Sequence, residues 1–171
     1  NLSITAFPSN KWQFNLFAWN YFGFFEVLVC GGAGFMGSHF IKYLLNKYPD
    51  YKVVNFDKLT YAGNLDNLTE VQNNPNYSFV KGDICDAGIL EKTIQDYKIE
   101  VIINYAAETH VDRSIMDPDA FLKTDVFGVY NLLEAVKKFN LQKMVQVSTD
   151  EVYGSIAKGK FTEESGFAPN S

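Results

Sequence analysis

Two groups of residues in this 171-residue chain have the types and the spacing to do chemistry, and the first is a glycine-rich segment. Gly31 permits a sharp turn, Gly34 lets the backbone approach a phosphate, and Gly37 allows a helix to pack closely on a strand. A helix that begins here would offer free amides and a partial positive charge to a pyrophosphate. The segment therefore predicts a phosphate-binding loop, with a turn that merely packs tightly as the alternative.

Asp57, twenty residues beyond Gly37, narrows the expected ligand. At the end of a predicted strand its carboxylate would meet an adenosine ribose and accept hydrogen bonds from both hydroxyls. The same charge would repel the additional phosphate of NADP. We therefore expect NAD, and Lys58 beside Asp57 leaves NADP as the less favoured alternative.

The second group is Thr149-Asp150-Glu151, directly after another predicted strand. Two adjacent carboxyl groups could supply one general acid and one general base if their surroundings pushed their pKa values apart. Neighbours on an extended strand point to opposite faces, so both side chains reach one substrate only if the chain turns after Val147. Gly154 is consistent with a loop there. Spacing alone favours a different interpretation, a solvated helix start with Thr149 as its N-cap.

Alternating strands and helices would position these groups. Apolar runs predict buried strands, and helical periodicity predicts the segments between them. The predicted strands are 27–29, 52–56, 77–80, 101–103 and 144–147, and the predicted helices are 35–48, 87–97 and 119–139, with a short helix expected within 64–74. The longest helix would carry one apolar stripe of Leu122, Val126, Val129, Leu133 and Val136. This order predicts an α/β fold, a Rossmann-type doubly wound parallel sheet with right-handed crossovers.

Composition excludes some classes of partner. A formal net charge of -5 argues against a nucleic acid or an anionic membrane as the ligand. Cys30 and Cys85 form neither a metal-binding spacing nor a disulfide framework, so a reducing cytoplasm is expected. His39 and His110 are too few and too far apart to predict a metal site.

The first 25 residues differ from the rest, and we divide the chain into an extension, 1–25, and an NAD-binding domain, 26–171. Residues 12–25 are uncharged and rich in aromatic side chains, but they are too few to span a membrane and lack a signal-peptide pattern. The chain begins with Asn1, and its first methionine is Met36. We expect a fragment whose extension is not native.

The glycine spacing resembles that of the extended short-chain dehydrogenase/reductase family. Within it, the chain from about residue 26 onward resembles the dTDP-glucose 4,6-dehydratases. The resemblance rests on the blocks 31–38, 57–64, 82–86, 106–114 and 148–154. Departures are mild: Cys30 stands where the family has Thr, Met36 replaces Ile, and Thr109 replaces Ser.

The resemblance implies NAD as cofactor, dTDP-glucose as substrate, and a homodimer that pairs the helix 119–139. Phe35 and Met36 would donate amides to the pyrophosphate, and Asp57 through Thr60 would surround the adenosine ribose. Asp83 could instead be a turn residue, and Thr124 a helix surface residue. The remaining implied cofactor contacts are Lys58, Leu59, Asp83 and Ile84 near the adenosine and Tyr105, Ala106, Ala107, Glu108, Thr109 and Thr124 near the nicotinamide.

The resemblance also assigns catalytic roles. Thr149, with Thr109 nearby, would hold the sugar, Asp150 would act as the acid, and Glu151 as the base. The family uses a Tyr-x-x-x-Lys pair that follows the segment resembling 168–171, so we expect no turnover from this chain. Tyr153 does not substitute, because the lysine position holds Ala157. An epimerase or decarboxylase of the same family, or a non-catalytic dinucleotide-binding module, remains an alternative.

Overall fold

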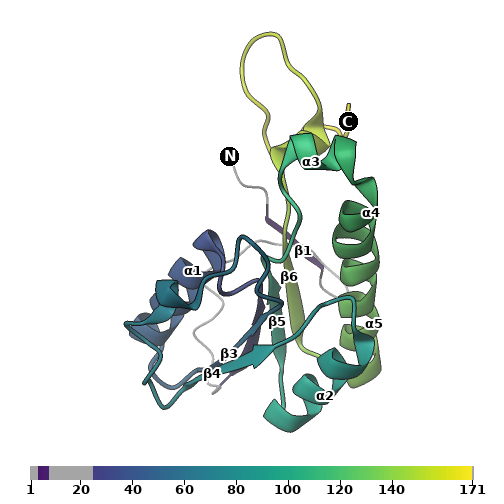
Figure 1. Cartoon of the computed structure of the whole chain (residues 1–171). Helices are drawn as coiled ribbons and strands as arrows, with labels where there is room; N and C mark the ends of the chain where they lie inside the picture. Colours follow the sequence, from purple (N-terminus) through teal and green to yellow (C-terminus); the bar gives the residue numbers. More distant parts are fainter. Residues whose placement is uncertain (1–3, 8–24, 171) are drawn as a thin grey trace.

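The strands of the chain form one twisted sheet, seen edge-on at the centre of Figure 1. The structure is a computed structural model that describes residues 4–7 and 25–170. The strands are β1 (Ile4–Phe7), β2 (Glu26–Cys30), β3 (Lys52–Asp57), β4 (Tyr77–Lys81), β5 (Val101–Asn104) and β6 (Lys143–Val147). Their order in space is β1-β6-β5-β2-β3-β4. All neighbours from β6 to β4 pair in parallel, which confirms the Rossmann-type sheet.

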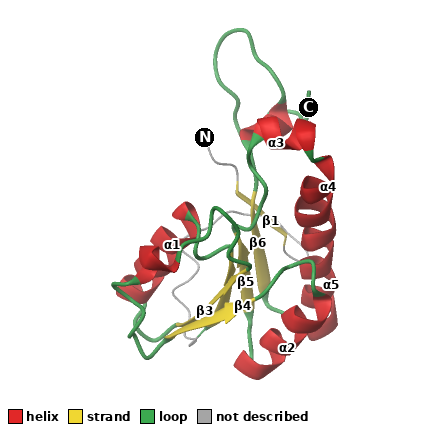
Figure 2. Ribbon diagram, viewed as in Figure 1, coloured by secondary structure: helices red, strands yellow, loops and turns green. Residues whose placement is uncertain are grey.

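Helices cover both faces of this sheet, as Figures 1 and 2 show. The helical segments are α1 (Phe35–Lys47), the 3-10 helix η2 (Leu65–Leu68), α2 (Ala87–Tyr97), α3 (Val111–Met116), α4 (Pro118–Phe121), the π-helical η3 (Leu122–Gly128), α5 (Val129–Phe139) and the 3-10 helix η4 (Asp150–Tyr153). On one face Val27 and Val29 pack with Ile41 of α1, and on the other Leu28 packs with Leu132 of α5. Burial on both faces explains why β2 and β5 read as continuous apolar runs.

The segment 64–74 holds the short helix that was expected there. Only Leu65–Leu68 is helical, as one 3-10 turn. The Asn64 side chain accepts the Asp66 N–H and starts this turn, and the segment then continues through further turns toward Pro75. Polar turn residues there compete for the backbone hydrogen bonds that a longer helix would need.

The predicted helix 119–139 is a helical run from Pro118 to Phe139, interrupted by the π-helical η3. Its predicted apolar stripe is wrong in part. Leu122, Val126 and Leu133 are 52%, 54% and 42% exposed, whereas Leu132 is fully buried. A π segment closes i→i+5 turns and therefore shifts the face that later residues present, which a constant helical period does not anticipate.

Strand β1 lies inside the extension of the first 25 residues, for which the sequence analysis assigned no element. It pairs antiparallel with β6, with Ile4 opposite Val147 and Phe7 opposite Met144. The aromatic residues from 12 to 24 lie outside the described residues. Within the described ranges, no helix combines the length and the apolar character needed to cross a membrane.

Candidate functional site

The glycine loop packs so closely on neighbouring backbone that two of its residues have no room for a side chain. Gly31 has φ +73°, and a Cβ on it would lie 2.6 Å from the backbone nitrogen of Ala106. A Cβ on Gly37 would collide with the carbonyl oxygen of Gly31. The loop therefore fits against both the exit of β5 and the start of α1, and at these two positions only glycine allows it.

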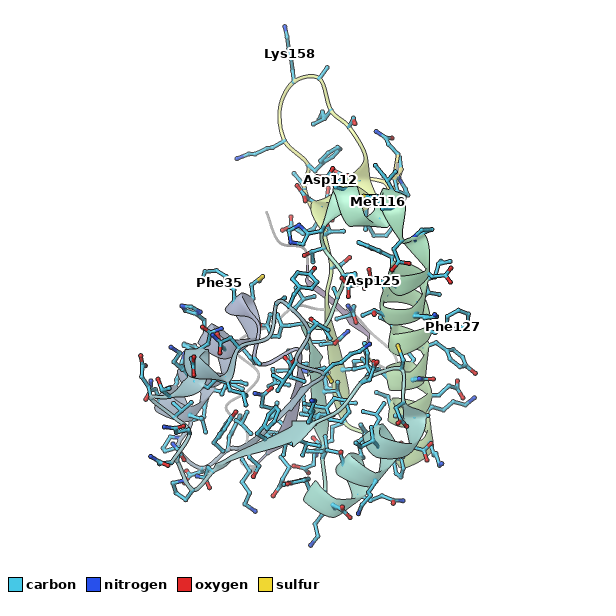
Figure 3. The ribbon with its side chains drawn as sticks, viewed as in Figure 1. Phe35, Asp112, Met116, Asp125, Phe127 and Lys158 are labelled. Atoms are coloured by element: carbon cyan, nitrogen blue, oxygen red, sulfur yellow. The ribbon has the colours of Figure 1, made fainter. Side chains whose placement is uncertain are left out.

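Helix α1 begins directly at this loop, with Gly34 as its N-cap and no capping side chain. The amides of Phe35 and Met36 belong to its first turn, where N–H groups lack intrahelical acceptors. Both side chains are exposed, and Figure 3 shows Phe35 at the free end of α1. The start of α1 thus leaves backbone donors available to a ligand.

Asp57 links the loop to the end of β3. Its side chain is only 8% exposed, and each oxygen accepts one backbone N–H: Oδ2 from Ala33 and Oδ1 from Leu59, both at 2.8 Å. Leu59 takes φ +58° so that its amide points back at the carboxylate. Each carboxylate oxygen keeps another lone pair. Asp57 can therefore accept ribose hydroxyls while it holds the loop.

A cavity opens at the carboxyl ends of the parallel strands, where open α/β sheets bind ligands. The predicted cofactor residues that line it are Gly31, Gly34, Asp57, Lys58, Thr60, Asp83, Ile84, Tyr105, Ala106, Ala107 and Thr124. The predicted ones outside its lining are Phe35, Met36, Gly37, Leu59, Glu108 and Thr109. Sequence reasoning missed Phe56, Ala62, Gly63 and Gly82. Phe56 and Gly82 lie at or directly after a strand end, which was the signal that could have found them, whereas Ala62 and Gly63 lie further along the loop after β3.

The end of the cavity next to β3 and β4 carries an ion pair. Lys58 Nζ lies 2.6 Å from Asp83 Oδ2, and Asp83 Oδ1 accepts the Cys85 N–H at 2.9 Å. Burial alone would raise the pKa of Asp83, but these two hydrogen bonds outweigh it and leave the pKa below its ordinary value. Asp83 is thus both a turn residue and part of the cavity wall.

Two side-chain amides, the buried Asn104 and the partly buried Gln146, fix the opposite wall. Asn104 is fully buried; its Oδ1 accepts the Ala106 N–H at 3.0 Å, and its Nδ2 donates to Gln146 Oε1 at 2.9 Å. Gln146 Nε2 donates in turn to the Val147 carbonyl at 2.9 Å. This chain of hydrogen bonds joins the cavity wall after β5 to the end of β6, two residues before Thr149.

The π-helical η3 contributes Thr124 to the lining of the cavity, and the next residue, Asp125 (Figure 3), contacts the segment after β5. Asp125 Oδ1 accepts the Glu108 N–H at 2.9 Å, and Tyr61 Oη donates to Glu108 Oε2 at 3.3 Å. Burial raises the pKa of Asp125, and the charge of Glu108 adds to this, although the Glu108 N–H partly offsets it. The segment after Ala107 is therefore held from two sides, by η3 and by the loop after β3.

Thr149, Asp150 and Glu151 lie at the end of β6, outside the lining of the cavity, and all three are exposed. The chain does turn after Val147, into the 3-10 helix η4. Thr149 Oγ1 accepts the Glu151 N–H at 3.3 Å, so the N-cap interpretation holds for the local structure. The Ala168 N–H donates to the Val152 carbonyl at 3.0 Å and fastens the turn to the C-terminal segment.

A tyrosine and a lysine four residues apart do occur on α1. Lys47 Nζ donates to Tyr43 Oη at 2.6 Å. This hydrogen bond, with the nearby phenol rings, raises the pKa of Lys47. Both side chains are exposed and outside the cavity lining, so this pair is a surface contact. Across the described part of the chain, no cluster of three or more His, Cys, Asp or Glu residues could hold a metal ion.

The parallel sheet, the glycine loop and the acid at the end of β3 together define a Rossmann-type dinucleotide-binding domain. The family model described as GDP-mannose 4,6 dehydratase matches residues 28–171. The chain belongs to this family.

Individual proteins with similar sequences support this family assignment. The low-salt glycan biosynthesis protein Agl12 of Haloferax volcanii is 48% identical over 146 residues, which cover 85% of this chain and 46% of that protein. A dTDP-glucose 4,6-dehydratase of Xanthomonas campestris is 44% identical over 154 residues, covering 84% and 43%. The resemblance to this group of enzymes, inferred from the sequence, is confirmed. The chain spans less than half the length of these relatives.

Solved structures match the same region. A dTDP-glucose 4,6-dehydratase of Bacillus anthracis in complex with NAD superimposes with a TM-score of 0.77 at 51% identity, over 86% of this chain and 45% of that one. A UDP-glucose 4-epimerase of Thermotoga maritima with UDP-glucose gives 0.74 at 31% identity, over 85% and 45%.

Proposed function

We propose that this chain is the NAD-binding part of a dTDP-glucose 4,6-dehydratase, an enzyme of nucleotide-sugar biosynthesis. The observation that carries the proposal is Asp57, which lines the cavity and is fixed to the glycine loop by the Ala33 N–H. The relatives named dTDP-glucose 4,6-dehydratase, and the NAD in the B. anthracis structure, support it.

The residues present fit NAD. The backbone of Ala106 holds the loop closely at Gly31, and the first turn of α1 has no capping side chain, so its amides remain available for the pyrophosphate. In the proposed complex Phe35 and Met36 donate from the first turn of α1, and Asp57 accepts the ribose hydroxyls. Ile84 packs on the adenine, and the segment from Tyr105 to Thr109 with Thr124 faces the nicotinamide.

When bound, NAD would supply the hydride acceptor for oxidation of carbon 4 of the sugar and the hydride donor for carbon 6. This chain contributes proton transfers and positioning. Thr149 holds the oxygen on carbon 4, Asp150 protonates the departing hydroxyl of carbon 6, and Glu151 removes the proton of carbon 5, which the neighbouring ketone has acidified.

Calorimetric titration with NAD tests the binding part of the proposal. We expect saturable binding at one site, lost or at least tenfold weaker in Asp57→Asn, because the carboxamide accepts less well from two hydroxyls. Asp50→Asn is the matched control, since Asp50 is an exposed carboxylate before β3, at the opposite end of that strand. Absence of NAD binding to the wild-type chain contradicts the proposal.

Turnover is a separate test. We propose that the 171-residue chain alone forms no 4-keto-6-deoxy product from dTDP-glucose, because Tyr153, the tyrosine nearest to Thr149 in sequence, has Ala157 and not a lysine four residues later. Product formation above a protein-free blank would overturn this.

We also propose that the α3–α5 side pairs with a second copy of the chain. Large apolar side chains gather there, and Figure 3 shows Met116 and Phe127 directed away from the sheet. The exposed residues are Ile115, Met116, Leu122, Val126, Phe127, Tyr130 and Leu133. Such a patch is typical of an interface. Sedimentation velocity should show a dimer that Val126→Glu with Leu133→Glu dissociates, whereas Tyr43→Glu on α1 does not.

A second candidate is a non-catalytic dinucleotide-binding module, favoured by the exposed position of Asp150 and Glu151 outside the cavity lining. An epimerase of the same family would also not need this pair. In a longer protein that contains this chain, a non-catalytic module would show no sugar-nucleotide turnover. Where turnover is present, substituting both residues abolishes it in a dehydratase and spares it in an epimerase. We expect a reducing, cytoplasmic setting, since Cys30 and Cys85 are both unpaired thiols.

A further inference from the structure

The ion pair at the adenosine end of the cavity joins two neighbouring strand ends. Lys58 follows β3, and Asp83 lies two residues beyond β4. Their side chains meet at 2.6 Å, and both residues line the cavity together with Asp57. The pair therefore lies in the wall that a bound adenosine would contact.

Lys58 is the neighbour of Asp57, the carboxylate proposed to bind the ribose. It directly follows Asp57, and in this fold a basic side chain near the acid accommodates the 2′-phosphate of NADP. Here the ammonium is directed to the Asp83 carboxylate. Asp57 has partners of its own, the Ala33 and Leu59 amides, so its charge stays at the ribose without being neutralised by Lys58.

We propose that Asp83 is a specificity residue, which excludes NADP by holding the Lys58 ammonium away from the 2′ position of the ribose. The inference rests on the proposed binding of NAD. A 2′-phosphate carries between one and two negative charges at neutral pH and needs a cation to offset its repulsion by Asp57. While Lys58 is paired, that cation is withheld, and Asp83 adds a further negative charge to the wall.

The surroundings of the pair support a held geometry. Asp83 is fixed by the Cys85 N–H on its second oxygen, so the carboxylate presents one orientation to the lysine. The hydrogen bond from Lys58 to Asp83 raises the pKa of the lysine despite partial burial, and both groups are therefore charged at neutral pH.

Calorimetric titration of the chain with NAD and, separately, with NADP tests the inference. In Asp83→Asn the remaining oxygen still accepts the Cys85 N–H, but Lys58 is released. The affinity for NADP relative to NAD should rise by roughly fivefold, near the upper limit for a partly exposed ion pair. The gain should disappear in Asp83→Asn combined with Lys58→Met, because the released ammonium is what binds the phosphate.

Asp86→Asn is the matched control. Asp86 belongs to the same loop and caps α2 by accepting the Gly88 and Ile89 amides, so its replacement removes one charge without releasing Lys58. Its affinity ratio should stay within twofold of the wild type. An unchanged ratio in Asp83→Asn, or a gain that persists without Lys58, overturns the inference while NAD binding stands. Failure of the wild type to bind NAD removes the proposed function and the inference with it.

Discussion

Two regions of the molecule each follow the end of a parallel strand but differ in burial. One is the glycine loop with Asp57, and the other is the turn that carries Thr149, Asp150 and Glu151. The first region is enclosed: backbone of the loop meets backbone of β5, and a nearly buried carboxylate closes the gap. The second region is an exposed single 3-10 turn whose threonine caps its own neighbour. Binding geometry is thus built into the core, whereas the proposed acid and base depend on what surrounds them in a complex.

The largest expected effect comes from adding one methyl group to the enclosed region. Gly31→Ala places a Cβ 2.6 Å from the Ala106 nitrogen at a positive φ, which should cost about 3 kcal/mol of the free energy of unfolding. Urea denaturation measures it. Gly166→Ala is the control, since no atom lies within 4 Å of its Cβ position. Equal effects at the two glycines would contradict an enclosed loop.

Replacing a carboxylate by an amide should have a different effect on the unfolding free energy in each of the two regions. Asp57→Asn leaves the Ala33 and Leu59 amides with one good acceptor instead of two, at a cost of about 2 kcal/mol in unfolding free energy. Glu151→Gln, at an exposed site, should change it by less than ~0.5 kcal/mol. Comparable losses of unfolding free energy in the two variants would show that the carboxylate in the turn after β6 stabilises the fold as much as Asp57 does.

The link between the regions should give a smaller effect. Gln146→Leu removes the acceptor of the buried Asn104 Nδ2, whose other contact, to the Ala106 carbonyl, is long at 3.4 Å. We expect a loss of about 1 kcal/mol, with weaker NAD binding because the wall after β5 loosens. The exposed Gln72, replaced in the same way, serves as the control. A loss of stability with unchanged NAD affinity would mean that the two walls are independent.

The sequence predicted the sheet and the enclosed region well, because both depend on local signals. Apolar runs mark strands buried on two faces, and the glycines with Asp57 mark the loop. The second region was harder, since Thr149 is an N-cap whatever Asp150 and Glu151 do in a complex. Long-range contacts were not readable: nothing near Asn104 predicts Gln146 as its partner, 42 residues away.

The π-helical η3 also escaped prediction, since one constant period was applied to the whole run from 119 to 139. Its extra residue per turn changed which apolar side chains face the sheet, burying Leu132 and exposing Leu133. It also lies beside the cavity, where Thr124 lines the wall and Asp125 accepts the Glu108 N–H. π segments frequently occur at functional sites, and a break in apolar periodicity was the available signal.

The smallest expected effect on stability is at Asp125. This residue is half-buried, and so lies between the enclosed glycine loop and the exposed turn after β6 in its degree of burial. Burial chiefly raises its pKa above the ordinary 3.8, so the folded chain holds this proton more tightly than the unfolded chain. The associated stabilisation is complete below pH 3.8 and is lost as the pH rises through the folded pKa. Asp125→Asn cannot ionise, and its oxygen still accepts the Glu108 N–H.

The gain in unfolding free energy from Asp125→Asn should therefore be greater at neutral pH than near pH 3.8, by less than ~1 kcal/mol given the solvent screening of a half-exposed group. Denaturation at the two pH values measures this difference. Asp117→Asn, which removes an exposed carboxylate just before the same helical run, is the control. A larger gain from Asp125→Asn at low pH would contradict the prediction. It would mean that the folded chain favours the charged form of Asp125, as we expect for Asp57.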